Sequence, residues 1–148
     1  MMETWVAKSA ENVSLAPFDY FSIGHIGMGV GIFLAFYLIY IYFWNKGFSE
    51  ISKTSLWAIF GLTFAAAIFW EVFENVLLLE LGQKFKDRPD SIYNLVTDMI
   101  FVSLGAGIDF SLHRKLKTPD NYRYFLYAAG ILLGLIAFWF LFRILTLN

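Results

Sequence analysis

The chain has 148 residues, of which 59% are hydrophobic, 20% aromatic and only 16% charged. Soluble domains carry about 25% charged residues. The mean hydropathy of +0.62 means that the chain has more apolar side chains than a globule of this size can bury. The net charge of −1 argues against nucleic acid as a partner, and the lack of cysteine excludes disulfides, thiolate-bound zinc and thiol chemistry. We therefore expect a single membrane domain over residues 1–148.

Four apolar segments are each long enough to cross a bilayer, which takes about 20 helical residues. They cover residues 20–44, 55–79, 92–112 and 122–145. Before them, residues 1–17 predict either an N-terminal tail or a short interfacial helix that ends at Pro17. Short polar loops make consecutive helices antiparallel, so the predicted fold class is an all-α, integral membrane, up-down four-helix bundle. An even number of spans places both termini on one side.

Two glycine pairs have the GxxxG spacing that lets helices approach each other closely in a membrane. Gly27 and Gly31 lie in the first segment, and Gly130 and Gly134 lie in the last. Each pair predicts a close contact with another helix, either within the chain or between copies in a homo-oligomer.

The second segment carries Glu71, Glu74 and Asn75 inside an otherwise apolar run. An ionised group within a bilayer costs about 2.5–3.5 kcal/mol by insertion measurements and usually faces the interior of a bundle, where it has a partner. Residues three and four positions apart are neighbours on a helix, so these three side chains are predicted to share one face. Either one of the two carboxylates is then protonated, or a cation lies between them.

Other polar residues fall at a similar depth on neighbouring segments. His25 lies near the start of the first segment, and Asp98 lies near the start of the third. With a helical rise of 1.5 Å per residue, His25, Asp98 and Glu71 lie roughly 8–12 Å from helix ends on the same side. We therefore predict one polar site built from three helices. Its main residues are His25, Glu71, Glu74 and Asp98, with Asn75, Asn94 and Arg143 in supporting positions.

One histidine and three carboxylates form a ligand set that suits zinc, manganese or iron(II) inside a helix bundle. A metal with an open coordination position would activate water. Without a metal, a carboxylic acid beside a histidine would act as an acid–base pair. The expected function is therefore a membrane-embedded hydrolase or transferase, metal-dependent or not, that acts on a lipid or envelope-linked substrate.

Two other classes of function use the same residues. In a proton or cation channel or transporter, the acids would be a titratable relay, which Ser103 and Asp109 would continue along the third segment. In a structural or assembly subunit of a membrane complex, the acids would only hold the helices together.

The site residues resemble a pattern found in YjdF-like and VanZ-like small polytopic membrane proteins. The stretches that carry this resemblance are Gly24-His25-Ile26-Gly27, Trp70-Glu71-Val72-Phe73-Glu74, and Asn94-Leu95-Val96-Thr97-Asp98-Met99 leading to Ser103-Leu104-Gly105-Ala106. The resemblance covers roughly residues 20–110. The chain departs from the pattern at Asn94, where an acid is favoured, and it is shorter, with four spans. The resemblance implies a cell-envelope membrane protein with a three-helix polar site and does not specify the reaction.

The expected location is a cell membrane, which the chain would cross several times in contact with lipid. Five Lys or Arg residues lie on the side of the termini, and six lie on the side of the first and third loops. Cytoplasmic loops carry an excess of Lys and Arg. This small excess predicts that the termini lie on the outer side.

Overall fold

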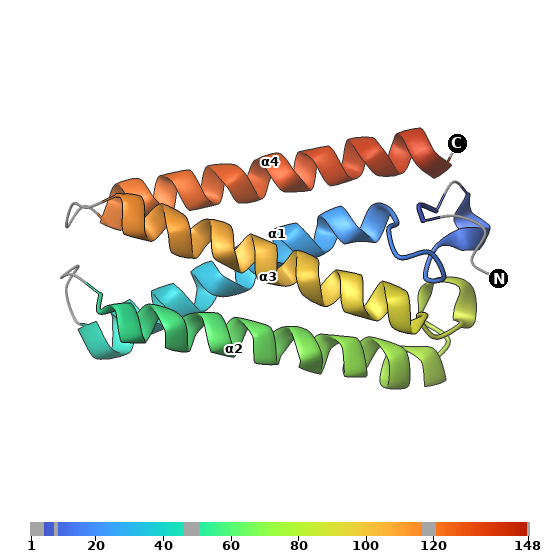
Figure 1. Ribbon diagram of the computed structural model, residues 1–148, viewed down its shortest axis with the longest axis horizontal. Helices are drawn as coiled ribbons and strands as arrows, with labels where there is room; N and C mark the ends of the chain where they lie inside the picture. The colour runs from blue at the N-terminus through green and yellow to red at the C-terminus, as the bar shows by residue number, and fades with distance from the viewer. Residues whose placement is uncertain (1–4, 8, 46–50, 117–120, 148) are drawn as a thin grey trace.

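The computed structural model describes residues 5–7, 9–45, 51–116 and 121–147, and these fold into helices joined by short connections. Four long helices run along the molecule (Figure 1): α1 (Tyr20–Tyr40), α2 (Lys53–Val72), α3 (Ile92–Lys115) and α4 (Asn121–Leu147). The prediction of an all-α chain with four helices is confirmed. Consecutive helices are antiparallel, and the two described ends of the chain lie at the same end of the bundle as the α2–α3 connection.

Helices α1 and α3 form the central pair and cross each other, while α2 and α4 flank them on opposite sides (Figure 1). At the crossing, a Cβ atom added to Gly29 would lie 2.1 Å from the Val102 carbonyl oxygen, and one added to Gly105 would lie 2.1 Å from the Ile26 carbonyl oxygen. The two backbones therefore touch where neither helix has a side chain. Close helix approach, predicted at Gly27 and Gly31, occurs at this other pair of glycines instead.

Helix α4 packs mainly on α1 and presents most of its surface outward. A Cβ atom added to Gly130 or Gly134 would meet nothing within 4 Å, so this glycine pair makes no close contact with the described part of the chain. All four helices are long and apolar enough to cross a membrane.

Side-chain caps begin the two helices that start at the end of the bundle near the α2–α3 connection, which we call its polar end. Asp19 begins α1 by accepting hydrogen bonds from the Phe21 and Ser22 backbone amides, at 2.8 and 3.2 Å, while its own amide donates to the Ser22 hydroxyl. Ser91 begins α3 by accepting from the Asn94 amide at 3.1 Å. These are favoured N-cap residues, whose side-chain oxygens satisfy amides that a helix leaves unpaired.

The segment before α1 folds across the start of α3. Its described residues, 5–7 and 9–19, include a 3-10 turn, Ala10–Asn12. The Ser91 amide donates to the Ser14 carbonyl at 2.8 Å, and the Ser91 hydroxyl donates to the Leu15 carbonyl at 2.9 Å. Ser14 itself has a φ of 69°, in the left-handed region, so a regular α-helix does not run through it.

Helix α2 does not end as a regular α-helix. A π-helical turn, η3 (Phe73–Leu78), follows directly after Val72. A π-helix has more residues per turn than an α-helix, so side chains within η3 are rotated relative to those of α2. Glu74 and Asn75 were both expected to continue the face of Glu71. Asn75 still contacts Glu71, whereas the Glu74 side chain does not.

Candidate functional site

The imidazole of His25 lies between two carboxylates from two other helices. Its Nε2 atom is 3.3 Å from Oε1 of Glu71 on α2, and its Nδ1 atom is 3.3 Å from Oδ1 of Asp98 on α3. Nδ1 also donates to the Phe21 carbonyl at 3.0 Å. The structure thus brings together three of the four residues predicted to form the centre of the site. We call His25, Glu71 and Asp98 the three-helix cluster.

The three-helix cluster is buried. Glu71 is only 5% exposed and Asp98 only 2%. Asn75 holds Glu71 in place, because its Nδ2 atom donates to the Glu71 backbone carbonyl at 3.0 Å and contacts Oε2 at 3.4 Å. Because Nδ1 donates to the Phe21 carbonyl, Nε2 is the ring nitrogen that can exchange a proton with its carboxylate, Glu71.

One donor atom from each of the three residues lies within 4.8 Å of the others, so the cluster can hold a metal ion. Zinc binds nitrogen and oxygen ligands at about 2.0–2.2 Å, which places neighbouring ligands of a tetrahedral site about 3.4 Å apart. The three side chains would therefore have to move closer together around an ion. His25 would supply one nitrogen, and the Phe21 carbonyl would hold the other, as is usual for histidine ligands.

Glu74, the fourth residue predicted for the centre of the site, lies outside the three-helix cluster and is not in the group that could share one metal ion. Its Oε1 atom pairs with Lys84 Nζ at 2.8 Å, and its Oε2 atom accepts from the Trp70 indole at 3.0 Å. Glu74 lies within the π-helical turn η3, which turns its side chain away from Glu71.

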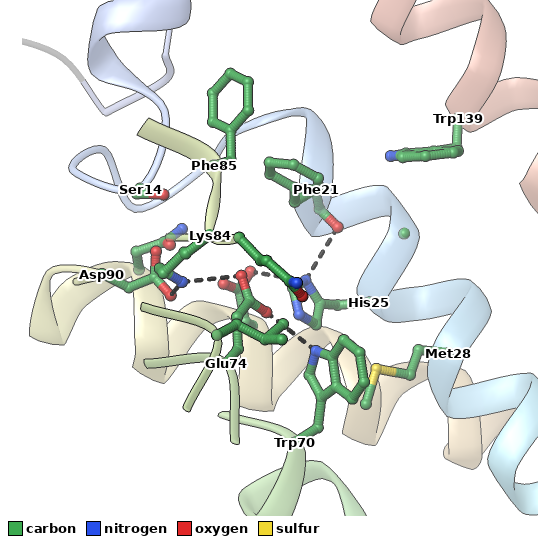
Figure 2. A pocket seen from close by; sticks show the side chains of 15 residues that line it. Ser14, Phe21, His25, Met28, Trp70, Glu74, Lys84, Phe85, Asp90 and Trp139 are labelled. Carbon is green, nitrogen blue, oxygen red and sulfur yellow. Dashed lines mark hydrogen bonds and ion pairs between the residues drawn. The ribbon is translucent and has the colours of Figure 1, made fainter. Parts of the chain in front are cut away.

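Lys84 is the main site residue that sequence reasoning missed. Its side chain is only 1% exposed and lies between Asp90, at 2.7 Å, and Glu74, as Figure 2 shows. Burial alone would lower the pKa of this ammonium, but hydrogen bonds and charge from Asp90 and Glu74 outweigh burial and raise that pKa above its usual 10.5. The sequence does contain one indication of such a cation: Glu74 lies in the apolar second segment without a predicted partner, and a buried acid calls for a cation near the same end of the bundle.

Asn75 connects this ion-pair group to the three-helix cluster. Its Nδ2 atom donates to Oδ2 of Asp90 at 2.9 Å, and its Oδ1 atom accepts from the Asp90 amide at 2.8 Å. Asn75 therefore contacts both Glu71 and Asp90. One continuous polar network joins α1, α2, α3 and the α2–α3 connection.

A cavity of about 330 Å³ lies beside the network (Figure 2). Polar and apolar side chains line different parts of it. The polar lining includes His25, Glu74, Lys84, Asp90, Asn94 and Asp98, and the apolar lining includes Phe21, Met28, Leu78, Phe85 and Trp139. Glu71 is not a lining residue, so Asp98 and His25 are the members of the three-helix cluster that meet the cavity. Its mixed lining suits a molecule that has a polar part and an apolar part.

The remaining predicted site residues take different places. Asn94 is 2% exposed and lines the cavity, and its Nδ2 atom has no hydrogen-bond partner among the described residues. Arg143 does not line the cavity; its guanidinium lies 5.9 Å from the centre of the Trp139 ring. Asn94 is thus available to a bound molecule, whereas Arg143 lies beside Trp139, one of the lining residues.

Comparison with known protein families, curated proteins and solved structures finds no match to this chain. The similarity to YjdF-like and VanZ-like proteins therefore stays a prediction, and the functional proposal below rests on the chain's own residues.

Proposed function

We propose that this chain is an integral membrane protein whose four helices cross a lipid bilayer. The support is the length and apolar character of the helices, together with large apolar side chains that point away from the bundle. Examples are Trp57, Phe69, Leu133 and Leu145, each more than half exposed. A continuous apolar exterior is expected where lipid replaces water as the solvent.

We further propose that the three-helix cluster is the centre of a hydrolase or transferase that acts on a lipid or envelope-linked substrate. One observation carries this proposal. His25 contacts two carboxylates, of which Glu71 is buried away from the cavity and Asp98 lines it, and the cavity has both polar and apolar walls. Buried polar residues of this kind within apolar helices usually have a function.

In the metal-free form of this proposal, Asp98 accepts the proton of an attacking water or acceptor hydroxyl. Asp98 then returns this proton to the leaving group. His25, whose Nδ1 atom donates to the Phe21 carbonyl, positions Asp98, and Glu71 faces the other ring nitrogen and stabilises positive charge on the imidazole. In the metal-dependent form, the same three residues would hold a divalent zinc, manganese or iron ion, which would supply a water molecule of lowered pKa. Elemental analysis of the purified protein distinguishes the two forms.

The test uses full-length protein in detergent, mixed with total membrane lipid extract, with products followed by mass spectrometry. Removing a general base lowers rates by about 10²–10⁴-fold, so Asp98→Asn should abolish product formation. Gly61→Ala is the matched control, because an added Cβ there meets nothing within 4 Å. Full activity in a folded Asp98→Asn protein would rule out the catalytic proposal.

One observation favours catalysis over conduction. An ion or proton path needs polar groups through the whole bundle, but beyond the cluster α1 and α3 touch backbone to backbone at Gly29 and Gly105. Apolar Val30, Val102 and Ala106 are fully buried around that contact. A structural role predicts that Glu71→Gln lowers thermal stability while the lipid products of wild type and variant stay identical.

A further inference from the structure

A second hollow adjoins the site cavity. It is a groove of about 430 Å³ between α1 and α4, and it shares Gly24, Met28 and Trp139 with the cavity beside His25. Its other walls are apolar and include Leu132 and Leu135. A polar cavity that continues into an apolar groove has the shape of a binding site for an amphiphile with one chain.

Glycines on α1 create this groove. A Cβ added to Gly27 would lie 3.8 Å from Leu135, and one added to Gly31 would lie 3.7 Å from Leu132, both ordinary contact distances. At Gly29 and Gly105, in contrast, an added Cβ would lie only 2.1 Å from a backbone oxygen. Gly27 and Gly31 therefore do not bring two backbones together, and their missing side chains leave space beside α4.

Two unpartnered donors face the space where the polar part of such a molecule would lie. Two buried nitrogens have no acceptor among the described residues: Nδ2 of Asn94, on the cavity lining, and the indole nitrogen of Trp139. Figure 2 shows the Trp139 nitrogen turned toward α1, at the junction of cavity and groove. Buried N–H groups without partners are costly, so a ligand that offers oxygen acceptors at these two points stabilises the site.

The charges around the cavity restrict the chemistry of the headgroup. Among the described residues, the four carboxylates of Glu71, Glu74, Asp90 and Asp98 outnumber the nearby groups that can be cationic. These are Lys84, which already pairs with two of the acids, His25, and Arg143, whose guanidinium lies 5.9 Å from the centre of the Trp139 ring. This excess of negative charge disfavours an anionic headgroup. An uncharged headgroup with ester and hydroxyl oxygens would accept hydrogen bonds from the two unpartnered donors and would not be repelled by the carboxylates.

We propose that the cavity and the α1–α4 groove together bind a single-chain amphiphile with a neutral, ester- or hydroxyl-bearing headgroup, the chain lying over Gly27 and Gly31 and the headgroup between Trp139 and Asn94. This inference rests on the proposed function for its chemistry and narrows the substrate to a class of which a monoacylglycerol is the simplest member.

The test uses full-length protein in detergent and a monoacylglycerol that carries a photoreactive diazirine in its acyl chain. Crosslinked peptides should come from the α1 and α4 residues of the groove, around Gly24–Ile32 and Leu132–Trp139. Gly31→Leu, which fills the groove, should reduce labelling at least fivefold, and Gly134→Leu, on the outer face of α4, should leave it unchanged. Trp139→Phe keeps an aromatic ring but loses the N–H donor, and should reduce labelling about threefold or more without altering thermal stability.

Two probes and one comparison decide the outcome. An anionic single-chain probe, lysophosphatidate with the same diazirine, should label the groove less than the monoacylglycerol does. Labelling spread over all lipid-facing helices, or equal for the two probes, overturns the inference. Because labelling needs no turnover, the two proposals fail separately. Groove labelling together with a fully active Asp98→Asn protein removes the catalytic proposal alone, and spread labelling with an inactive Asp98→Asn protein removes the groove alone.

Discussion

Gly105 offers a substitution whose effect on stability can be worked out from the crossing of α1 and α3. In Gly105→Ala, the new Cβ atom would lie 2.1 Å from the Ile26 carbonyl oxygen, whereas real Cβ contacts essentially never fall below 3.0 Å. The obstacle is backbone, which cannot rotate away as a side chain can. The two helices must therefore separate by about 0.9 Å, the difference between these two distances.

This separation lowers stability because overpacking a close contact costs typically 1–3 kcal/mol and because the surrounding side chains lose dispersion contacts. Alanine has a better helix propensity than glycine by about 1 kcal/mol, which offsets part of the loss. We expect Gly105→Ala to lower the free energy of unfolding by about 2 kcal/mol. Gly107→Ala is the matched control on the same helix, since an added Cβ there meets nothing within 4 Å, and it should be neutral or gain up to about 1 kcal/mol.

Reversible unfolding by sodium dodecyl sulfate in mixed micelles, followed by tryptophan fluorescence, measures both variants against wild type. We expect the free energy of unfolding to fall in Gly105→Ala and to rise or stay unchanged in Gly107→Ala. Equal effects of the two substitutions would refute a backbone contact at the crossing.

Three further predictions concern the polar end of the bundle. Lys84→Met leaves Glu74 and Asp90 without their cation and should lower stability by about 3 kcal/mol, as removal of one partner of a buried ion pair does. The folded-state pKa of Lys84 is raised above 10.5, so the stability that its charge contributes is complete below pH 10.5 and is lost as the pH rises through the folded-state pKa. The melting temperatures of wild type and variant should therefore converge at alkaline pH. A difference in melting temperature that does not change with pH would contradict the ion pairs. Asn75→Leu leaves the Asp90 amide without its acceptor and should cost about 1–3 kcal/mol, measured by the same detergent unfolding, with Asn75→Asp as a variant that keeps an acceptor. Asp19→Ala removes the N-cap of α1 and should cost about 1 kcal/mol, whereas Asp19→Ser should recover most of that loss in the same measurement.

Hydropathy and loop length predict the four helices because these features depend on the local sequence. The meeting of His25, Glu71 and Asp98 was also predictable, since helix direction and a fixed rise per residue place them at one depth. The i, i+3 rule failed at Glu74 because it assumes an uninterrupted α-helix, and α2 changes to a π-helix at Phe73. Nothing in the residue types around Glu74 indicates that change.

Lys84 shows a second limit of sequence reasoning. It lies in a polar connection with other basic residues, where a solvent-exposed side chain is the ordinary expectation. Its burial depends on how the α2–α3 connection folds back over η3, which is a tertiary property. The contact partner of a GxxxG glycine also depends on tertiary structure. The glycine spacing indicates that α1 has a face of small residues, but the helix crossing determines which glycine of α1 meets α3.

The contact between Gly29 and Gly105 also determines how α1 and α3 can move relative to each other. A slide of one residue along either helix would push Val30 or Ala106 into the space that now has no side chain, so translation is blocked. A change in crossing angle keeps glycine against backbone, so rotation about this point is the easier motion. His25 precedes Gly29 on α1 and Asp98 precedes Gly105 on α3, and their side chains lie 3.3 Å apart, so both are on the same side of this pivot. The width of the gap between them therefore varies with the crossing angle, and the bundle can open or close its polar end without separating at its centre.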